Sequence, residues 1–196
     1  MTDTTDTAEQ QVIARAQRGD ADAVATLYRR HVDAIARYIA YRVSDDSAVE
    51  DITAEVFLRM VERLPHYRPT GAPFEAWLYR IAATRVADHY RRDTHRQGRS
   101  LDDEASAGEH EPALELSIVE REEFEALRTA LHELTDEQQT ILILRFVERK
   151  SHEEVARILD KSSHAVAAAQ HRALKKLAGL LGTDKADRHY LRGQSP

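Results

Sequence analysis

The stretch Phe74 to Arg92, FEAWLYRIAATRVADHYRR, decides how the rest of this chain can be interpreted. Its apolar residues recur mostly at steps of three, four and seven, the spacing of one buried helix face. They are Phe74, Trp77, Leu78, Ile81 and Val86. Arginine, threonine and aspartate fill the positions between them. We therefore expect a helix with one face in a core and the other presenting cations outward.

Positive charge and aromatic rings gather around this helix. From Arg59 to Arg92 there are seven arginines and three acidic residues, a local net of +4 in a chain whose formal net charge is -6. The single tryptophan lies here, with Tyr67, Tyr79 and Tyr90 in or near the segment. Such a surface suits a single-stranded nucleic acid, because phosphates attract cations and unpaired bases stack on flat rings. The alternative is a solvated arginine face over an aromatic core, and periodicity alone favours that alternative.

Composition limits the fold and the chemistry. The 196 residues, 42% of them hydrophobic, can form one domain or two small ones. The absence of cysteine excludes disulfides, a thiolate nucleophile and a cysteine-based zinc site. The first residues, MTDTTDTAEQQ, are polar and no apolar run approaches a membrane span, so we expect a cytoplasmic protein without membrane insertion. Scarce glycine and proline, without β-branched alternation, predict an all-α fold.

Helix signals divide the first half of the chain. We expect a short helix over Ala8–Arg18 and a longer one from Ala23 to about Val43. Ser47 and Glu50 form a predicted capping box, so the third helix should open at Ala48. Prolines and glycine then mark a loop over Pro65–Pro73, with Tyr67 and Arg68 at its centre.

An acidic segment separates a second helical unit from the first. From Asp102 to Glu125 there are ten acidic residues and one arginine, a net of -9. We expect two small helical domains joined by a flexible linker. The predicted boundaries are 1–95 for the first domain, 96–112 for the linker, 113–182 for the second domain and 183–196 for a tail.

The second domain carries the pattern of a helix-turn-helix. Capping boxes at Thr135 with Gln138 and at Ser151 with Glu154 open two helices, and the second ends near Leu159. A turn over Asp160–Ser163 leads into a last helix from about His164 to Leu181, with Gly182 as its predicted stop. A short helix, a tight turn and a longer helix with a basic end are typical of this motif.

The two halves together resemble the extracytoplasmic-function (ECF) sigma factors of bacterial RNA polymerase. The matching text is LYRRHVDAIARYI, EDITAEVF, the Phe74–Arg92 stretch, LTDEQQTILILRFVERKSHEEVARIL and AVAAAQHRALKKL. In such proteins the first unit binds the polymerase clamp and the minus-ten promoter element, and the second binds the flap and the minus-thirty-five element. The resemblance implies an alternative sigma factor whose partners are core RNA polymerase and promoter DNA. An anti-sigma factor is a further partner that it leaves open.

The resemblance also assigns site residues. Asp51 and Glu55 match the acidic pair that meets the polymerase clamp, and Tyr67 matches a loop residue that captures a flipped base. The predicted minus-ten residues are Tyr67, Arg68, Arg80, Thr84, Asp88 and Arg91. The predicted minus-thirty-five residues are His164, Ala167, Ala168, His171, Arg172, Lys175 and Lys176. We expect Trp77 to be buried in the core and Tyr67 to contribute little to stability.

The chain departs from the family pattern at several positions. Alanine occupies position 54, where a glutamine is usual, and threonine occupies position 84 instead of asparagine. Ala167, Ala168 and Ala169 replace a polar triplet of the recognition helix, and alanine cannot hydrogen-bond to a base edge. Asp160 replaces the usual turn glycine, which aspartate tolerates because it adopts the left-handed region readily. We therefore expect few base contacts from the second domain.

Two other binding functions and an enzymatic function are alternatives to that of a sigma factor. A helix-turn-helix regulator acting without polymerase explains the second domain, but not the Tyr67 loop preceding the Trp77 helix. A sigma-like protein that occupies polymerase without reading promoters is also compatible with the alanines. An enzyme is not expected: the His152 segment lacks the second histidine of a zincin, and no glycine-rich phosphate loop exists. The sequence predicts no metal site and no cofactor.

Overall fold

The computed structural model describes residues 3–97 and 118–181, and all regular structure within these ranges is helical. The described chain separates into two compact units. Within the described residues, no helix is long and apolar enough to cross a membrane. The all-α fold expected from the sequence is confirmed.

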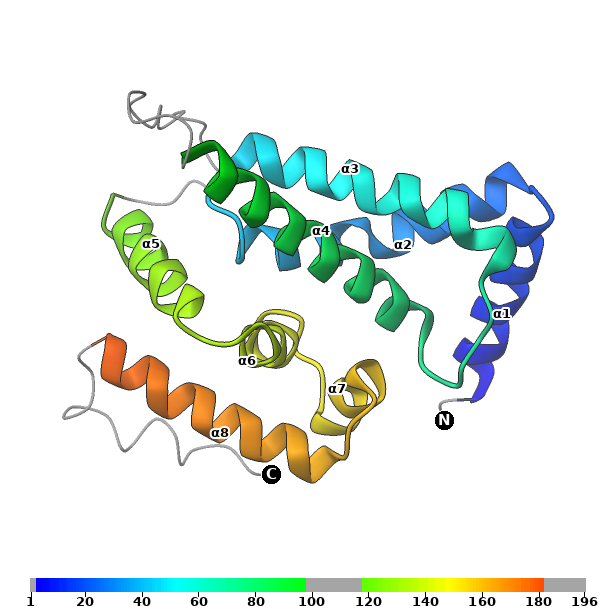
Figure 1. Ribbon diagram of the computed structural model, residues 1–196. Helices are drawn as coiled ribbons and strands as arrows, with labels where there is room; N and C mark the ends of the chain where they lie inside the picture. The colour runs from blue at the N-terminus through cyan, green and yellow to red at the C-terminus, as the bar shows by residue number, and fades with distance from the viewer. Residues whose placement is uncertain (1–2, 98–117, 182–196) are drawn as a thin grey trace. The chain divides into compact units, whose positions relative to one another are not determined.

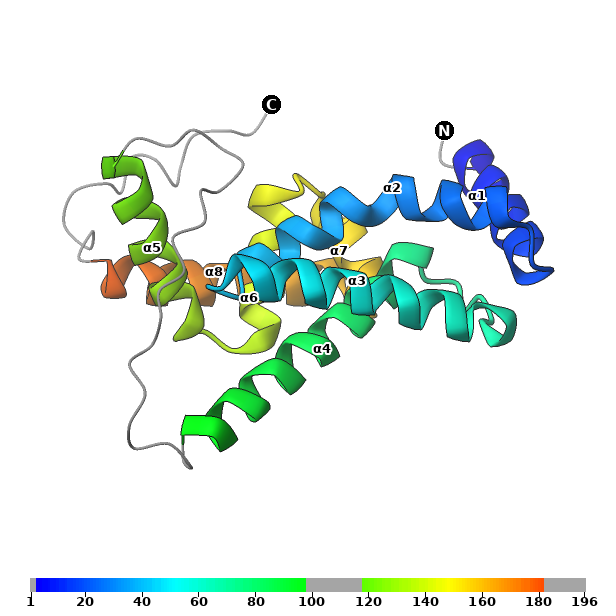
Figure 2. The ribbon, with the colours of Figure 1, turned by 90° about the horizontal axis from the view of Figure 1, so that it is seen from above.

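The first unit is built from four α-helices and one short 3₁₀ turn. They are α1 (Asp3–Gln17), α2 (Ala21–Ala40), α3 (Asp46–Arg63), η1 (Leu64–His66) and α4 (Phe74–Gln97). Helix α2 packs against α1, α3 and α4, and α3 also packs along α4 (Figures 1 and 2). The segment Tyr67–Pro73 connects η1 to α4 and contains Gly71, whose φ of 83° lies in the left-handed region that glycine adopts without strain.

Aspartates cap the N-termini of α2 and α3. The Asp20 side chain accepts hydrogen bonds from the backbone N–H groups of Asp22 and Ala23. At α3 the cap is Asp45, whose side chain accepts from the Ser47 N–H. The predicted capping box of Ser47 with Glu50 is therefore wrong. Asp45 precedes Ser47 by two residues and satisfies its N–H first, so the helix begins at Asp46.

The core of this unit lies where α2, α3 and α4 meet. Its most deeply buried large side chains are Leu27, Ile35, Tyr38, Ile39, Val43, Val56, Met60, Leu64 and Leu78. Phe74 and Val86 are also buried, as the helical spacing predicts. Trp77 is an exception, because its side chain is half-buried instead of belonging to the fully enclosed core. The buried Arg42 guanidinium donates to the Tyr38 hydroxyl at 2.6 Å.

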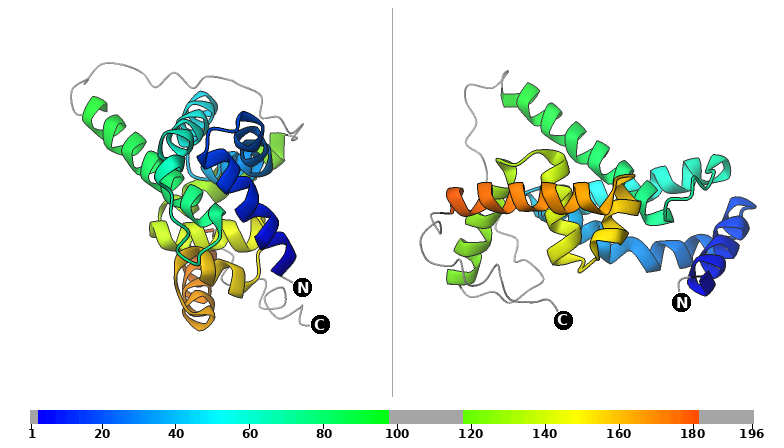
Figure 3. Two further views of the ribbon diagram at one scale, coloured as in Figure 1. Left: turned by 90° about the vertical axis from the view of Figure 1, so that its right-hand side faces the viewer. Right: turned by 90° about the horizontal axis from the view of Figure 1, so that it is seen from below.

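The second unit places α8 against shorter helices. The elements that follow residue 117 in the chain are α5 (Ile118–His132), α6 (Asp136–Leu142), a π-helical turn η2 (Ile143–Val147), α7 (His152–Leu159) and α8 (Ser163–Leu180). Helix α8, orange in Figure 3, packs against α6 and α5. The predicted capping box of Thr135 with Gln138 is confirmed. The box of Ser151 with Glu154 is confirmed as well, with both reciprocal hydrogen bonds present.

A π turn, η2, follows α6 directly. The Glu148 N–H donates to the Ile143 carbonyl, a spacing of five residues instead of the usual four. The additional residue per turn changes which side chains face the core. Ile143 and Leu144 remain buried, whereas Phe146 is 55% exposed.

The helix-turn-helix follows the expected chain order. Asp160 has a φ of 54°, in the left-handed region, as its position in the turn predicts. Ser162 caps α8 by accepting from the Ala165 N–H, so the last helix begins at Ser163, one residue before the predicted His164. The predicted stop at Gly182 lies outside the described residues.

The predicted domain boundaries stay predictions. Helix α4 continues through Gln97, two residues beyond the predicted end of the first domain at 95. The rest of the predicted acidic linker, the start of the second domain at 113 and the tail at 183–196 lie outside the described residues.

Candidate nucleic-acid interface

A cavity lined by arginines and aromatic rings lies within the first unit. It has a volume of about 560 Å³. Its lining residues are Arg59, Arg63, His66, Tyr67, Arg68, Thr70, Trp77, Arg80, Ile81, Thr84 and Arg85. We refer to it as the cationic cavity. The structure thus brings the end of α3, the connecting loop and the first three turns of α4 to one site.

Two aromatic rings form one wall of the cationic cavity. The Tyr67 ring lies 4.7 Å from the Trp77 ring at an interplanar angle of 38°. It also meets Phe74 edge-on, with ring centroids 5.2 Å apart. Tyr67 is therefore part of an aromatic cluster, instead of standing apart from the packed structure as expected. Because both rings line the cavity and are half-buried, they offer surface on which an unpaired base can stack.

Three of the cavity arginines are available to a ligand. Arg63, Arg68 and Arg80 are exposed, and none of them has a carboxylate within ion-pair distance in the described residues. Arg59 instead pairs with Glu62 at 3.0 Å, one helical turn further along α3. The three available guanidinium groups can each bind a phosphate oxygen through two N–H donors.

The predicted minus-ten residues do not all reach this cavity. Tyr67, Arg68, Arg80 and Thr84 line it, and the Thr84 hydroxyl donates to the Arg80 carbonyl at 2.9 Å. Asp88 and Arg91 lie outside its lining and form an ion pair with each other. The sequence reasoning missed Arg59, Arg63, His66 and Arg85 as cavity residues. The arginines near Tyr67 in the sequence could have indicated these residues. Only the packing of α3 against α4, however, brings them to one cavity.

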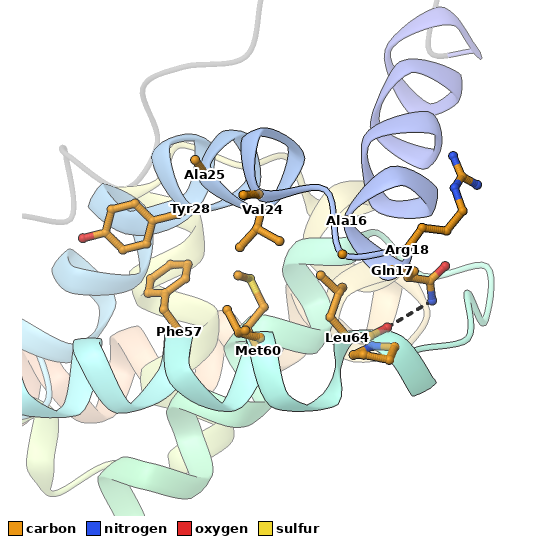
Figure 4. A pocket seen from close by; sticks show the side chains of 13 residues that line it. Ala16, Gln17, Arg18, Val24, Ala25, Tyr28, Phe57, Met60 and Leu64 are labelled. Carbon is orange, nitrogen blue, oxygen red and sulfur yellow. Dashed lines mark hydrogen bonds between the residues drawn. The ribbon is translucent and has the colours of Figure 1, made fainter.

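Helix α1 holds the loop that carries Tyr67. The Gln17 side-chain amide donates to the carbonyl of Leu64 at 3.1 Å and to that of Tyr67 at 2.7 Å. Figure 4 shows the first of these hydrogen bonds, at one end of an apolar groove between α1, α2 and α3. The Gln17 side-chain amide therefore donates to backbone carbonyls at both ends of η1. Nothing in the sequence linked Gln17 to a loop about 50 residues away.

The predicted polymerase-binding pair lies on α3 beside a second, acidic cavity. Asp51 is exposed and Glu55 is half-buried, and both line a cavity of about 350 Å³ with Asp45, Ser47, Ala48, Ile52, His89 and Arg92. We refer to it as the acidic cavity. Glu55 also accepts a hydrogen bond from Arg85 of α4 at 2.9 Å. The two carboxylates therefore differ, because Asp51 presents its charge to solvent and Glu55 shares its charge with an arginine.

Helix α8 presents a face of cations and small side chains. His164, His171, Arg172, Lys175 and Lys176 are exposed, as the sequence predicts. Ala167 and Ala168 are partly exposed, but Ala169 is only 3% exposed and belongs to the core. The side-chain amine of Lys176 donates to the backbone carbonyl of Glu133, just after α5. Lys176 thus also serves to hold α8 against the end of α5, where a cation is favoured.

A polar network that the sequence did not reveal fixes α8 within its unit. The Gln170 side-chain oxygen accepts from Arg145 Nε at 3.0 Å and lies 3.0 Å from His152 Nε2. Because that oxygen is an acceptor, His152 Nε2 must carry a proton. Arg145 also donates to the Lys150 carbonyl, across the end of the π turn. His152 is therefore a scaffold residue, and the described residues hold no group of three or more side chains that could bind a metal.

Comparison with known proteins identifies the family. The sigma-70 region 2 model matches residues 27–96, and the sigma-70 region 4 model matches residues 124–177. The ECF RNA polymerase sigma factor SigD of Mycobacterium tuberculosis is 36% identical over 175 residues, which cover 85% of this chain and 80% of SigD. This chain belongs to the ECF sigma factor family. As a sigma factor it is a regulatory factor of transcription initiation.

Other sigma factors are similar over most of this chain. The ECF sigma factor BldN of Streptomyces coelicolor is 37% identical over 174 residues, which cover 89% of this chain but 66% of BldN. The structure of CnrH, a sigma factor of Cupriavidus metallidurans, was solved with the cytosolic domain of CnrY. It matches with a TM-score of 0.66 at 25% identity and covers 91% of this sigma factor and 99% of CnrH. Region 2 corresponds to α2–α4, so α1 and Gln17 precede the matched segment.

Proposed function

We propose that this sigma factor binds core RNA polymerase through Asp51 and Glu55 and captures an unpaired minus-ten base in the cationic cavity. The observation that carries the proposal is the cavity itself, where three available arginines surround the paired rings of Tyr67 and Trp77. Duplex DNA hides the faces of its bases, so rings can stack only on a base that has left the duplex. The cavity therefore favours melted promoter DNA over intact duplex.

The acidic face of α3 supports polymerase binding by a separate surface. Asp51 is exposed one helical turn before Glu55, and the apolar side of the same helix is buried under α2 and α4. Charged groups on a rigid helix give an oriented contact whose strength falls as salt rises. Such a contact leaves the cationic cavity available for DNA.

The exposed face of α8 supports a role at the minus-thirty-five element. His171, Arg172 and Lys175 can bind phosphates, whereas Ala167 and Ala168 offer methyl groups only. We therefore assign most of the promoter choice to the minus-ten element. The two other candidate functions have no comparable support, because neither requires aromatic rings beside available arginines.

Charge reversal at Asp51 tests polymerase binding. Asp51→Lys should weaken binding to purified core polymerase at low salt while leaving helicity and the melting temperature unchanged, because Asp51 makes no ion pair in the described residues. Glu50→Lys, at another exposed carboxylate of α3 that makes no ion pair in the described residues, is the matched control. Equal affinity of wild type and Asp51→Lys for core polymerase would contradict the assigned surface. Run-off transcription on promoter fragments with the same proteins tests initiation.

An inhibitory protein partner is also part of the proposal. CnrH was solved with the cytosolic domain of another protein, and a partner that covers α3 would compete with polymerase for the same carboxylates. Co-purification from the native host, followed by competition with core polymerase, tests for such an anti-sigma factor.

A further inference from the structure

One arginine joins the acidic face of α3 to the cationic cavity. Arg85 of α4 lines the cationic cavity, and its partner Glu55 lines the acidic cavity. Arg85 Nη1 donates to Glu55 Oε1 at 2.9 Å, and Arg85 Nη2 lies 2.6 Å from Asp88 Oδ2. Two carboxylates from different helices therefore hold this guanidinium, in contrast to the available Arg63, Arg68 and Arg80.

The charges around Arg85 cancel. Asp88 also pairs with Arg91, so the cluster contains two arginines and two carboxylates. The side chains of Arg85, Glu55 and Asp88 are 21%, 30% and 23% exposed, so solvent screens their interactions less than those of fully exposed pairs. While Glu55 holds Arg85, the cluster has no net charge to attract a phosphate. Removing Glu55 from the cluster would leave a net charge of +1 beside the cationic cavity.

We propose that Arg85 is a further DNA-binding residue, whose charge becomes available when core polymerase engages Glu55. This inference rests on the proposed role of Glu55 in polymerase binding. A cation of the polymerase competes with Arg85 for the Glu55 carboxylate, and a weakened Glu55–Arg85 pair leaves the guanidinium to bind a phosphate at the cavity. Because linkage is reciprocal, DNA bound at Arg85 also frees Glu55 for polymerase. One ion pair thereby couples the two binding events.

The test uses the free sigma factor and a fluorescent single-stranded oligonucleotide at low salt. Glu55→Gln removes the carboxylate that holds Arg85, and Asp51→Asn removes an equal charge from the same helix without contacting Arg85. We expect Glu55→Gln to bind the oligonucleotide several-fold more tightly than wild type in an anisotropy titration. Asp51→Asn should change the affinity much less. The oligonucleotide affinity of Glu55→Gln should also depend more steeply on salt than that of wild type, by the amount expected for about one additional phosphate contact.

A second substitution shows whether Arg85 is responsible. Arg85→Met in the Glu55→Gln background should abolish the gain, and thermal melting confirms that each variant is folded. Asp88→Asn removes the other carboxylate at Arg85 without altering α3, but Arg85 keeps its Glu55 partner, so this variant should gain less affinity than Glu55→Gln. Equal gains from Glu55→Gln and Asp51→Asn, a gain that survives Arg85→Met, or no gain from Glu55→Gln would overturn the inference.

The polymerase-bound state separates this inference from the proposed function. With saturating core polymerase, Glu55 is already engaged in wild type, so the DNA affinities of wild type and Glu55→Gln should converge. A gain that persists undiminished in the holoenzyme would show that Arg85 is not coupled to polymerase. Failure of the proposed function itself would be seen separately, as unchanged affinity of Asp51→Lys for core polymerase.

Discussion

The cationic cavity of the first unit and the exposed face of α8 in the second unit both present cations, but in different surroundings. In the cavity, Arg63, Arg68 and Arg80 stand around the rings of Tyr67 and Trp77. On α8, Arg172 and Lys175 stand beside alanines, and this helix has no phenylalanine, tyrosine or tryptophan. The first surface is hollow and aromatic, and the second is a helix face with few hydrogen-bond donors for bases.

This difference predicts a division of labour between the two DNA surfaces. Stacking and a shaped cavity can discriminate among unpaired bases, whereas cations beside methyl groups bind the sugar-phosphate backbone of any duplex. The arginines contribute affinity in both places. Selectivity should therefore depend mainly on the residues around Tyr67, and the experiments on Tyr67, Gln17 and Arg172 test this.

The largest effect is expected from the aromatic wall of the cavity. Tyr67→Ala removes a stacking surface worth about 1–3 kcal/mol per base, so open-complex formation should fall by roughly fivefold to more than a hundredfold. Permanganate reactivity of melted promoter DNA in the holoenzyme measures this directly. Tyr67→Phe keeps the ring and should retain most of the opening.

The contacts of Tyr67 with Phe74 and Trp77 make a stability control necessary. Tyr67→Ala should lower the melting temperature to some extent, because the ring packs in the aromatic cluster. Core polymerase affinity should nevertheless remain near that of wild type. If polymerase binding and opening fell in parallel, Tyr67 would be a structural residue and the base-capture role would be wrong.

A smaller effect is expected from Gln17, which positions the Tyr67 loop. Gln17→Leu removes two hydrogen bonds to loop carbonyls, each worth about 0.5–1.5 kcal/mol, at similar side-chain volume. Promoter opening should decrease less than in Tyr67→Ala, and polymerase affinity should be unchanged. Gln11→Leu, at an exposed position of the same helix, is the matched control. In a double-mutant cycle, Gln17→Leu should have little further effect once Tyr67 is alanine, and full additivity would contradict the positioning role.

Removing a cation from α8 should have a smaller and less selective effect. Arg172→Ala should weaken promoter binding about evenly across minus-thirty-five sequences and reduce the salt slope by about one. Transcription from templates with every single-base change in both elements measures the selectivity. Minus-thirty-five changes that cost as much as minus-ten changes would show that the alanine-rich helix reads bases.

The smallest effect concerns the pH dependence of α1 docking. The imidazole of His31, whose Nε2 lies 3.3 Å from Glu9 Oε1, and the guanidinium of Arg30 hold the pKa of Glu9 below its ordinary value of 4.5, although partial burial opposes this shift. A lowered pKa in the folded state adds stability above about pH 5, which is lost as pH falls through the folded value. Glu9→Gln should flatten this part of the stability profile in acid titrations of the melting temperature. An unchanged acid profile of Glu9→Gln would show that the contacts of Glu9 with Arg30 and His31 do not hold α1.

The sequence predicted the helices and the family more accurately than the site. The helical spacing of the apolar residues from Phe74 to Val86 predicted the buried face of α4. The capping boxes at Thr135 and Ser151 predicted where two helices begin. Both signals are local, because they depend on residues close together in the chain. Errors arose where neighbouring interactions compete. Asp45 replaced Ser47 as a cap, and Trp77 is half-buried because it lies at the edge of the core beside Tyr67.

The amino-acid sequence by itself determined that this chain is helical, that it carries a helix-turn-helix and that it resembles an ECF sigma factor. Periodicity, capping residues and motif order suffice for these conclusions, since each depends on residues close together in the chain. Only the tertiary structure decided which charges are available. It places Glu55 on Arg85 and Gln17 on the Tyr67 loop. These contacts join residues 30 and 50 positions apart, and no local pattern encodes such pairings.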